Sequence, residues 1–98
     1  MTINKTQNGS SLTIALGGRL DTTTAPELEA VVKDSLDSVT ELVFDMAELD
    51  YISSAGLRVL LGAQKTMNKQ GTMVVKNVND DINEIFDVTG FVDILTIE

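Results

Sequence analysis

Two adjacent serines, Ser53 and Ser54, are the residues of this chain whose type and position best suit chemistry. They follow the apolar segment Leu42-Val43-Phe44 and precede leucines at helical spacing, so the pair falls where a loop becomes a helix N-terminus. The first N–H groups of a helix have no intrahelical partner, and the helix dipole favours an anion beside them. A serine placed there can cap the helix, or it can carry a phosphate without disturbing the fold.

Both interpretations of Ser54 stay open from the residues alone. As a cap, Ser54 would contribute about 1 kcal/mol to stability, and serine is among the commonest N-caps. As a phosphorylation site, it would acquire nearly two negative charges on a docking surface. Those charges would repel an acidic patch of a partner, so the modification would block binding without unfolding the protein.

The composition excludes several classes of function. Histidine and cysteine are absent, which rules out Ser-His-Asp and Cys-His nucleophiles and zinc sites built on these residues. We therefore expect no catalytic residue and no metal ligand, although a carboxylate site for Mg²⁺ or Ca²⁺ is conceivable. The net charge of −8 opposes binding to nucleic acids and to anionic membranes, and favours a basic or mixed protein surface as partner.

The length of 98 residues fits one domain, expected to span residues 1–98. With 43% hydrophobic residues the chain can bury a core, and no signal peptide or membrane-spanning run is visible. The absence of cysteine fits a reducing compartment, so we expect a cytoplasmic protein.

The hydrophobic pattern predicts the element order β-β-α-β-α-β-α-β and a mostly parallel sheet of four to five strands with about three helices. Residues 2–7 and 12–16 form an N-terminal β-hairpin around Asn8-Gly9, and Gly17-Gly18 ends its second strand at a bulge or tight end. Functional groups of such sheets gather beyond the carboxyl ends of the strands, where Asp21, Asp45 and the serines fall.

Finer expectations concern the ends of these elements. Thr24 and Glu27 predict a capping box at the first helix, and Leu42-Val43-Phe44 predicts a short central strand that is buried on both faces and closed by Asp45. The second helix is expected from about Ser54 to about Gln70, with Gly71 in the left-handed region after it. Asn79 or Asp80 would cap a third helix, and apolar residues from Val92 to Ile97 predict a last strand.

Residues 42–61, together with Gly18-Arg19-Leu20-Asp21, resemble a STAS domain of the anti-sigma factor antagonist (anti-anti-sigma factor) group. That family has a hydrophobic strand ending in Asp, followed by Asp-Ser-x-Gly-Leu at the start of a helix. This chain has Leu42-Val43-Phe44-Asp45 and then Ser53-Ser54-Ala55-Gly56-Leu57.

The resemblance implies a partner-switching protein that is not itself an enzyme. By this resemblance Ser54 matches the serine that a partner kinase phosphorylates, and the kinase is an anti-sigma factor of the histidine-kinase-like ATPase class. That kinase would bind the ATP, so no cofactor is expected in this chain, and a metal-dependent serine phosphatase would reverse the reaction. The implied partner-binding residues, in a monomer or weak dimer, are Asp21, Thr22, Thr23, Ser53, Ser54, Ala55, Gly56, Leu57 and Arg58.

The chain departs from the family pattern at Ser53, which stands where relatives have Asp. Ser53 is therefore an alternative phosphate acceptor, although we expect it to cap the helix. Arg58 replaces a small residue of some relatives and bears on partner choice. The alternative function is that of an unmodified STAS subunit of a lipid or anion transport complex.

Overall fold

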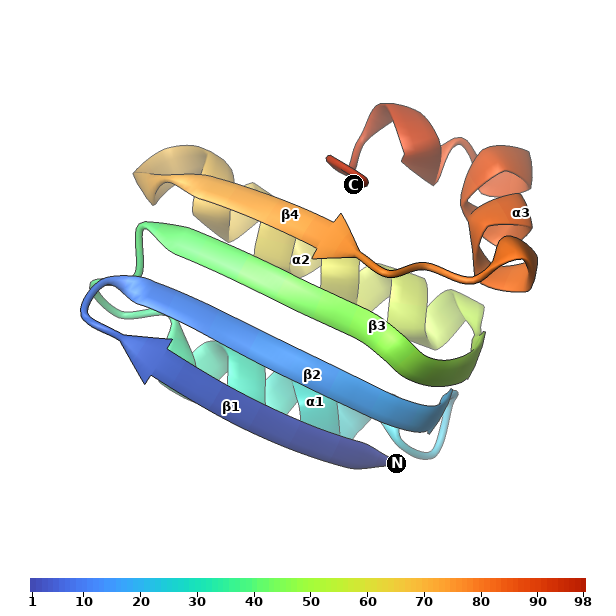
Figure 1. Ribbon diagram of the computed structural model, residues 1–98, viewed down its shortest axis with the longest axis horizontal. Coiled ribbons are helices and arrows are strands. Elements are labelled where there is room, and N and C mark those ends of the chain that lie inside the picture. The colour runs from blue at the N-terminus through green and yellow to red at the C-terminus, as the bar shows by residue number, and fades with distance from the viewer.

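The computed structural model describes residues 1–98 and contains one four-stranded sheet in the order β1-β2-β3-β4. Strands β1 (Thr2–Asn8) and β2 (Ser11–Leu20) form an antiparallel hairpin, while β2, β3 (Glu41–Ile52) and β4 (Thr72–Lys76) run parallel (Figure 1). Helices α1 (Ala25–Ser35) and α2 (Ser54–Gln70) make the crossovers, and α3 (Asp80–Thr89) follows β4. The predicted α/β class, the hairpin and the three helices are confirmed.

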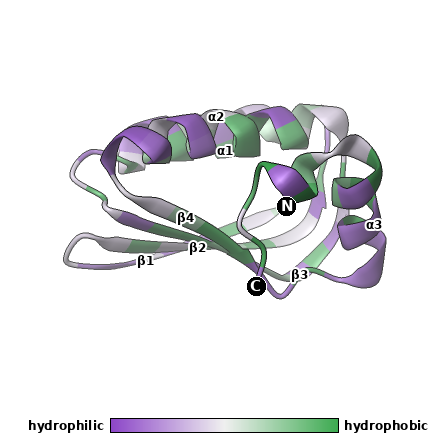
Figure 2. Ribbon diagram, turned by 90° about the horizontal axis from the view of Figure 1, so that it is seen from above, coloured by the Kyte–Doolittle hydropathy of each residue, from purple (hydrophilic) through white to green (hydrophobic).

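Helices α1 and α2 lie together on one face of the sheet (Figure 2). Residues Leu12 and Ile14 of β2 point to that face and are buried, whereas Thr13 between them is only half-buried. The same alternation holds in β3, where Phe44 is buried and Val43 is half-buried. The central position of β3 is confirmed, but its predicted burial on both faces is wrong, because neither crossover helix covers the second face.

Strand β3 is much longer than predicted, since it does not close at Asp45 but continues to Ile52. Its pairing with β2 continues past a register shift between Ala15 and Gly17 and a second shift between Gly18 and Arg19. Gly18 adopts a φ of 85° there, which glycine tolerates readily. The predicted bulge at the glycine pair is confirmed, whereas the predicted end of β2 at this point is wrong.

The predicted last strand does not form. After Gly90, which ends α3 at a φ of 79°, residues Phe91–Asp93 form a 3-10 helix, η1. Only one parallel bridge follows, between Val75 and Ile97, with Val75 N–H donating to Thr96 O at 2.8 Å. The sheet therefore has four strands and a single bridge in place of a fifth.

The helix ends follow the predicted positions with different contacts. Thr24 precedes α1, but its hydroxyl makes no capping bond and donates instead to Arg19 O at 2.8 Å, so the capping box is absent. Helix α2 ends at Gln70 as predicted. Gly71 is extended, with a φ of 174°, not left-handed, and glycine is needed because a Cβ would lie 1.9 Å from Thr40 O.

Candidate functional site

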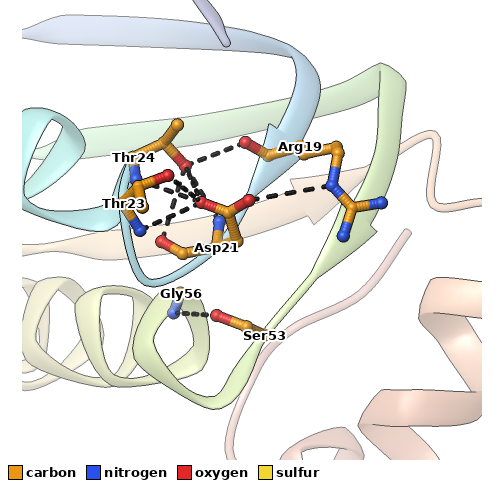
Figure 3. Close-up of polar contacts among 6 residues, drawn as sticks. All are labelled: Arg19, Asp21, Thr23, Thr24, Ser53 and Gly56. Atoms are coloured by element: carbon orange, nitrogen blue, oxygen red, sulfur yellow. Dashed lines mark hydrogen bonds and ion pairs between the residues drawn. The ribbon is translucent and has the colours of Figure 1, made fainter.

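The candidate site lies where the parallel strands β2 and β3 end side by side (Figure 3). Leu20 pairs with Ile52 at the last position of the ladder, and Ser53 N–H donates to Leu20 O at 2.9 Å. This pairing brings the turn after β2, which begins at Asp21, to the start of α2. The predicted neighbourhood of Asp21 with the two serines follows directly from this topology.

Ser53 is the N-cap of α2. Its backbone is extended (φ −99°, ψ 176°), its Oγ accepts from Gly56 N–H at 3.4 Å, and its carbonyl accepts the first helical bond from Leu57 N–H at 2.9 Å. The expected capping role of Ser53 is therefore confirmed, and the alternative in which Ser54 caps the helix is wrong. The cap occupies one donor of the first turn and leaves the other N–H groups of that turn without helical partners.

Ser54 is the first residue of α2, and its side chain is exposed. Its Oγ makes no hydrogen bond within the chain, in contrast to the hydroxyl of Ser53. No acidic residue lies in the first turn of α2. A reactant can thus reach this hydroxyl from solvent, and an anion attached to it would lie at the positive end of the helix dipole.

Asp21 organises the turn beside the serines. Its Oδ1 accepts from the hydroxyl of Thr23 at 2.7 Å and from the N–H groups of Thr23 and Thr24 at 3.0 and 3.2 Å. These bonds, that from the Thr23 hydroxyl most of all, lower the pKa of Asp21 below its ordinary value. The carboxylate is therefore ionised at neutral pH and adds a fixed negative charge to this end of the sheet.

Arg19 and Tyr51 complete the edge of the site, although neither was predicted as a site residue. Arg19 Nε lies 3.7 Å from Asp21 Oδ2, and its guanidinium stands over the Tyr51 ring at 4.3 Å from the centroid. An exposed ion pair of this kind contributes little stability, but the stacking orients the cation. The pairing register of β2 and β3 indicates this contact, because Arg19 and Tyr51 are cross-strand partners.

Gly56 and Leu57 seat the first turn of α2 on the sheet. A Cβ at Gly56 would lie 2.7 Å from Leu20 Cγ and 2.9 Å from Ile52 Cγ1, both in buried side chains. Leu57 is itself buried among core residues. This position therefore requires a residue without a side chain because of the space available, and not because of a left-handed backbone.

The remaining predicted binding residues are exposed or half-buried around the same turn. Thr22, Thr23 and Arg58 are exposed, and Ala55 is half-buried. The predicted set thus divides into a surface group that a partner could touch and a buried pair, Gly56 and Leu57, that supports it. The predicted place of Asp45 beside the serines is wrong, because β3 continues past it. Asp45 lies beside the end of β4, where its Oδ1 accepts from Asn77 and from Ala47 N–H.

Nowhere in the structure do three carboxylates converge in a group that could hold a metal ion. None of its helices has both the length and the apolar character required to cross a membrane.

The fold and this exposed junction define a small α/β domain that presents a hydroxyl on its surface. The STAS domain family matches residues 2–98, and the chain belongs to this family. The similarity therefore extends over nearly the whole sequence.

Two relatives illustrate the match. The chain is 35% identical over 88 residues to BtrV of Bordetella bronchiseptica, whose name places it among anti-sigma factor antagonists; the match covers 88% of this chain and 76% of BtrV. It is 28% identical over 92 residues to the anti-sigma-B factor antagonist of Bacillus subtilis, covering 93% of this chain and 84% of the relative. Both names describe proteins that counteract an anti-sigma factor.

Solved structures share the fold. SpoIIAA, an anti-sigma factor antagonist, superposes in its unphosphorylated form with a TM-score of 0.78 at 16% identity, over 99% of this chain and 87% of SpoIIAA. Phosphorylated SpoIIAA of Bacillus gives the same TM-score at 17% identity, over 99% and 91% of the two chains.

Proposed function

We propose that this protein is an anti-sigma factor antagonist that switches partners through phosphorylation of Ser54. The observation that carries the proposal is the exposed Ser54 hydroxyl, free of hydrogen bonds at the first residue of α2. Family membership supports it, because relatives are named antagonists and SpoIIAA has been solved with and without phosphate. Unphosphorylated protein would bind a serine kinase that is also the anti-sigma factor.

The chemistry requires little of this chain beyond presenting the hydroxyl. The kinase would supply ATP and the base that accepts the proton of Ser54 Oγ as the γ-phosphoryl group is transferred. The new phosphate would lie over the unpaired N–H groups of the first turn, which favour an anion. The charged Asp21 on the neighbouring turn would add to the negative potential, so the partner loses affinity while the fold stays intact.

Ser53 differs from Ser54 in ways that favour Ser54 as acceptor. The Ser53 hydroxyl already accepts from Gly56 N–H, and the side chain is half-buried. A phosphate on Ser53 would break the cap, whereas one on Ser54 would leave it in place. A separate metal-dependent phosphatase would remove the phosphate from Ser54.

The test combines the protein, ATP and a serine kinase of the histidine-kinase-like ATPase class from the same organism, followed by mass spectrometry of the peptides. We expect phosphate on Ser54, loss of the reaction in Ser54→Ala, and its retention in Ser53→Ala. In a binding assay, Ser54→Asp should weaken the kinase complex while the far-UV circular dichroism stays unchanged. An unmodified chain, or equal binding by Ser54→Asp, would contradict the switch and favour a constitutive binding role.

A further inference from the structure

Helix α2 carries an unusual charge for this chain. It contains Arg58, Lys65 and Lys69, three of the seven basic residues, and none of the fifteen acidic residues. All three are exposed, and none forms a salt bridge. A protein with a net charge of −8 therefore has one helix whose charged residues are all basic.

A groove of about 810 Å³ runs between α1 and α2. Its floor is formed by buried apolar residues: Val32 of α1, Leu36 at the C-cap of α1 and Val59 of α2. On the α2 side the half-buried Leu61 lines the groove together with Arg58 and Lys65. On the α1 side, Lys33 lines the groove together with two acidic residues, Glu29 and Asp37, and Lys33 Nζ lies 3.0 Å from Glu29 Oε1. The unpaired positive charge of the groove is thus that of α2.

Gly62 lies in this groove, one turn from Arg58 and from Lys65. It sits in the interior of α2, where glycine costs up to about 1 kcal/mol relative to alanine. Gly62 is exposed, and a Cβ at this position would meet nothing within 4 Å. Packing inside the protein requires glycine at position 56, whereas no contact within the chain requires it at position 62.

We propose that the α1–α2 groove binds an acidic amphipathic helix of the partner protein. The backbone of that helix would cross α2 closely at Gly62, and its carboxylates would pair with Arg58 and Lys65. Its apolar side chains would cover Leu61, which is half-buried in the groove lining. Charge complementarity selects the acidic character of the occupant, and the absence of a side chain at Gly62 permits the close approach of a helix.

This inference rests on the proposed function and adds the chemistry of the partner to it. Thr22 and Ala55, the sequence neighbours of Asp21 and Ser54, line the same groove, which therefore extends to the switch site. A phosphate on Ser54 would then stand at the end of a groove filled by carboxylates. Repulsion between like charges would explain release of the partner without a change of fold.

The first experiment measures binding of the same serine kinase by titration calorimetry. Gly62→Leu, and separately Arg58→Glu combined with Lys65→Glu, should each weaken binding about tenfold or more. The matched control, Lys5→Glu combined with Lys76→Glu, changes the net charge equally on β1 and β4, outside the groove, and should stay within about twofold. Circular dichroism checks that every variant is folded.

The second experiment needs no kinase. A synthetic helical peptide of Leu, Ala and Glu, and the same peptide with Lys for Glu, are titrated into the ¹⁵N-labelled protein. The acidic peptide should shift amide signals of α1 and α2 around Gly62, Gly62→Leu should abolish the shifts, and the basic peptide should cause none.

The outcomes separate this inference from the switch. Groove variants that bind the kinase like wild type, while Ser54→Asp still weakens binding, would overturn the groove and leave the switch standing. If the kinase does not bind at all, the switch fails. The groove is then tested by the acidic peptide alone: amide shifts around Gly62 would support it, and their absence would overturn it. Self-association of the wild type through α2, seen as concentration-dependent shifts without peptide, would overturn the partner helix in favour of a second copy.

Discussion

Two glycines of α2 show that the same residue type can serve opposite purposes within one helix. Gly56→Ala places a methyl group within 3 Å of Leu20 and Ile52, so we expect it to lower the free energy of unfolding by about 1–3 kcal/mol. Gly62→Ala meets open space and gains helix propensity, so it should raise stability by about 0.5–1 kcal/mol. Urea unfolding of both variants checks this, and destabilisation by Gly62→Ala would contradict the open environment.

The adjacent serines allow an equally direct comparison. Ser53→Ala removes the acceptor of Gly56 N–H and should destabilise the protein by about 1 kcal/mol. Ser54→Ala removes a hydroxyl without a partner, so its unfolding free energy should stay within about 0.5 kcal/mol of wild type. Thermal unfolding of the two variants measures the difference. A larger loss of stability in Ser54→Ala than in Ser53→Ala would contradict the role of Ser53 as the cap.

Between elements, Asp45 joins β3 to the segment after β4. Its carboxylate accepts from Asn77 Nδ2 at 2.9 Å and from Ala47 N–H at 3.1 Å, and these bonds, that from Asn77 most of all, lower its pKa. A lowered folded pKa contributes stability above the unfolded value of about 3.9, and this stability is lost as the pH falls through the folded value.

Asp45→Asn should therefore be less stable than wild type at pH 7, by about 1 kcal/mol or less because the site is partly exposed. The difference should shrink as the pH falls below about 4, since wild type then loses the charged acceptor. Asp37→Asn is the control, because Asp37 is exposed and accepts no hydrogen bond within the chain. A constant difference between Asp45→Asn and wild type from pH 7 to pH 3 would contradict this account.

The success of sequence-based prediction also varied between elements. The bounds of helix α2 agree with the predicted range of about Ser54 to about Gln70, because Ser53 and Gly71 mark its ends and leucines mark its buried side. The extension of β3 was missed, since its acidic residues and its uneven pairing with the bulged β2 hide the alternation. The final segment was predicted as a strand from its β-prone residues. The N–H groups of Ile94 and Leu95 both donate to Phe91 O instead, so the turn after Gly90 forms in place of a strand.

The candidate site was predictable only where chain order determines geometry. Ser53, Ser54 and Asp21 come together because adjacent parallel strands end at the same edge. The α1–α2 groove could not be predicted, because its shape depends on how two helices separated by β3 pack together. Helical spacing alone also does not reveal that Gly62 faces solvent while Gly56 is buried.

At the scale of the whole molecule, charge is distributed unevenly over a small volume. The radius of gyration is 12.1 Å and the net charge is −8, so the acidic groups of different elements repel one another at low salt. The screening length falls from about 30 Å at 0.01 M salt to about 10 Å at 0.1 M. It therefore changes from roughly the length of the molecule, 32 Å, to less than its smallest extent, 19 Å. Added salt also screens the basic residues of α2, so their attraction to an acidic partner weakens as the salt concentration rises.

Stability and partner binding should therefore respond to salt in opposite directions. Between 10 and 150 mM NaCl we expect the Tm of the free protein to rise by about 2–4 °C, which corresponds to roughly 0.5 kcal/mol for a domain of this size. Asp34→Lys combined with Asp87→Lys changes the net charge from −8 to −4, since each change adds two positive units, and should reduce this rise by more than half. Scanning calorimetry of both proteins across the salt series measures the effect. An equal rise in the two would mean that the ions act through general solvation and not through screening of the acidic surface, because only screening depends on the net charge.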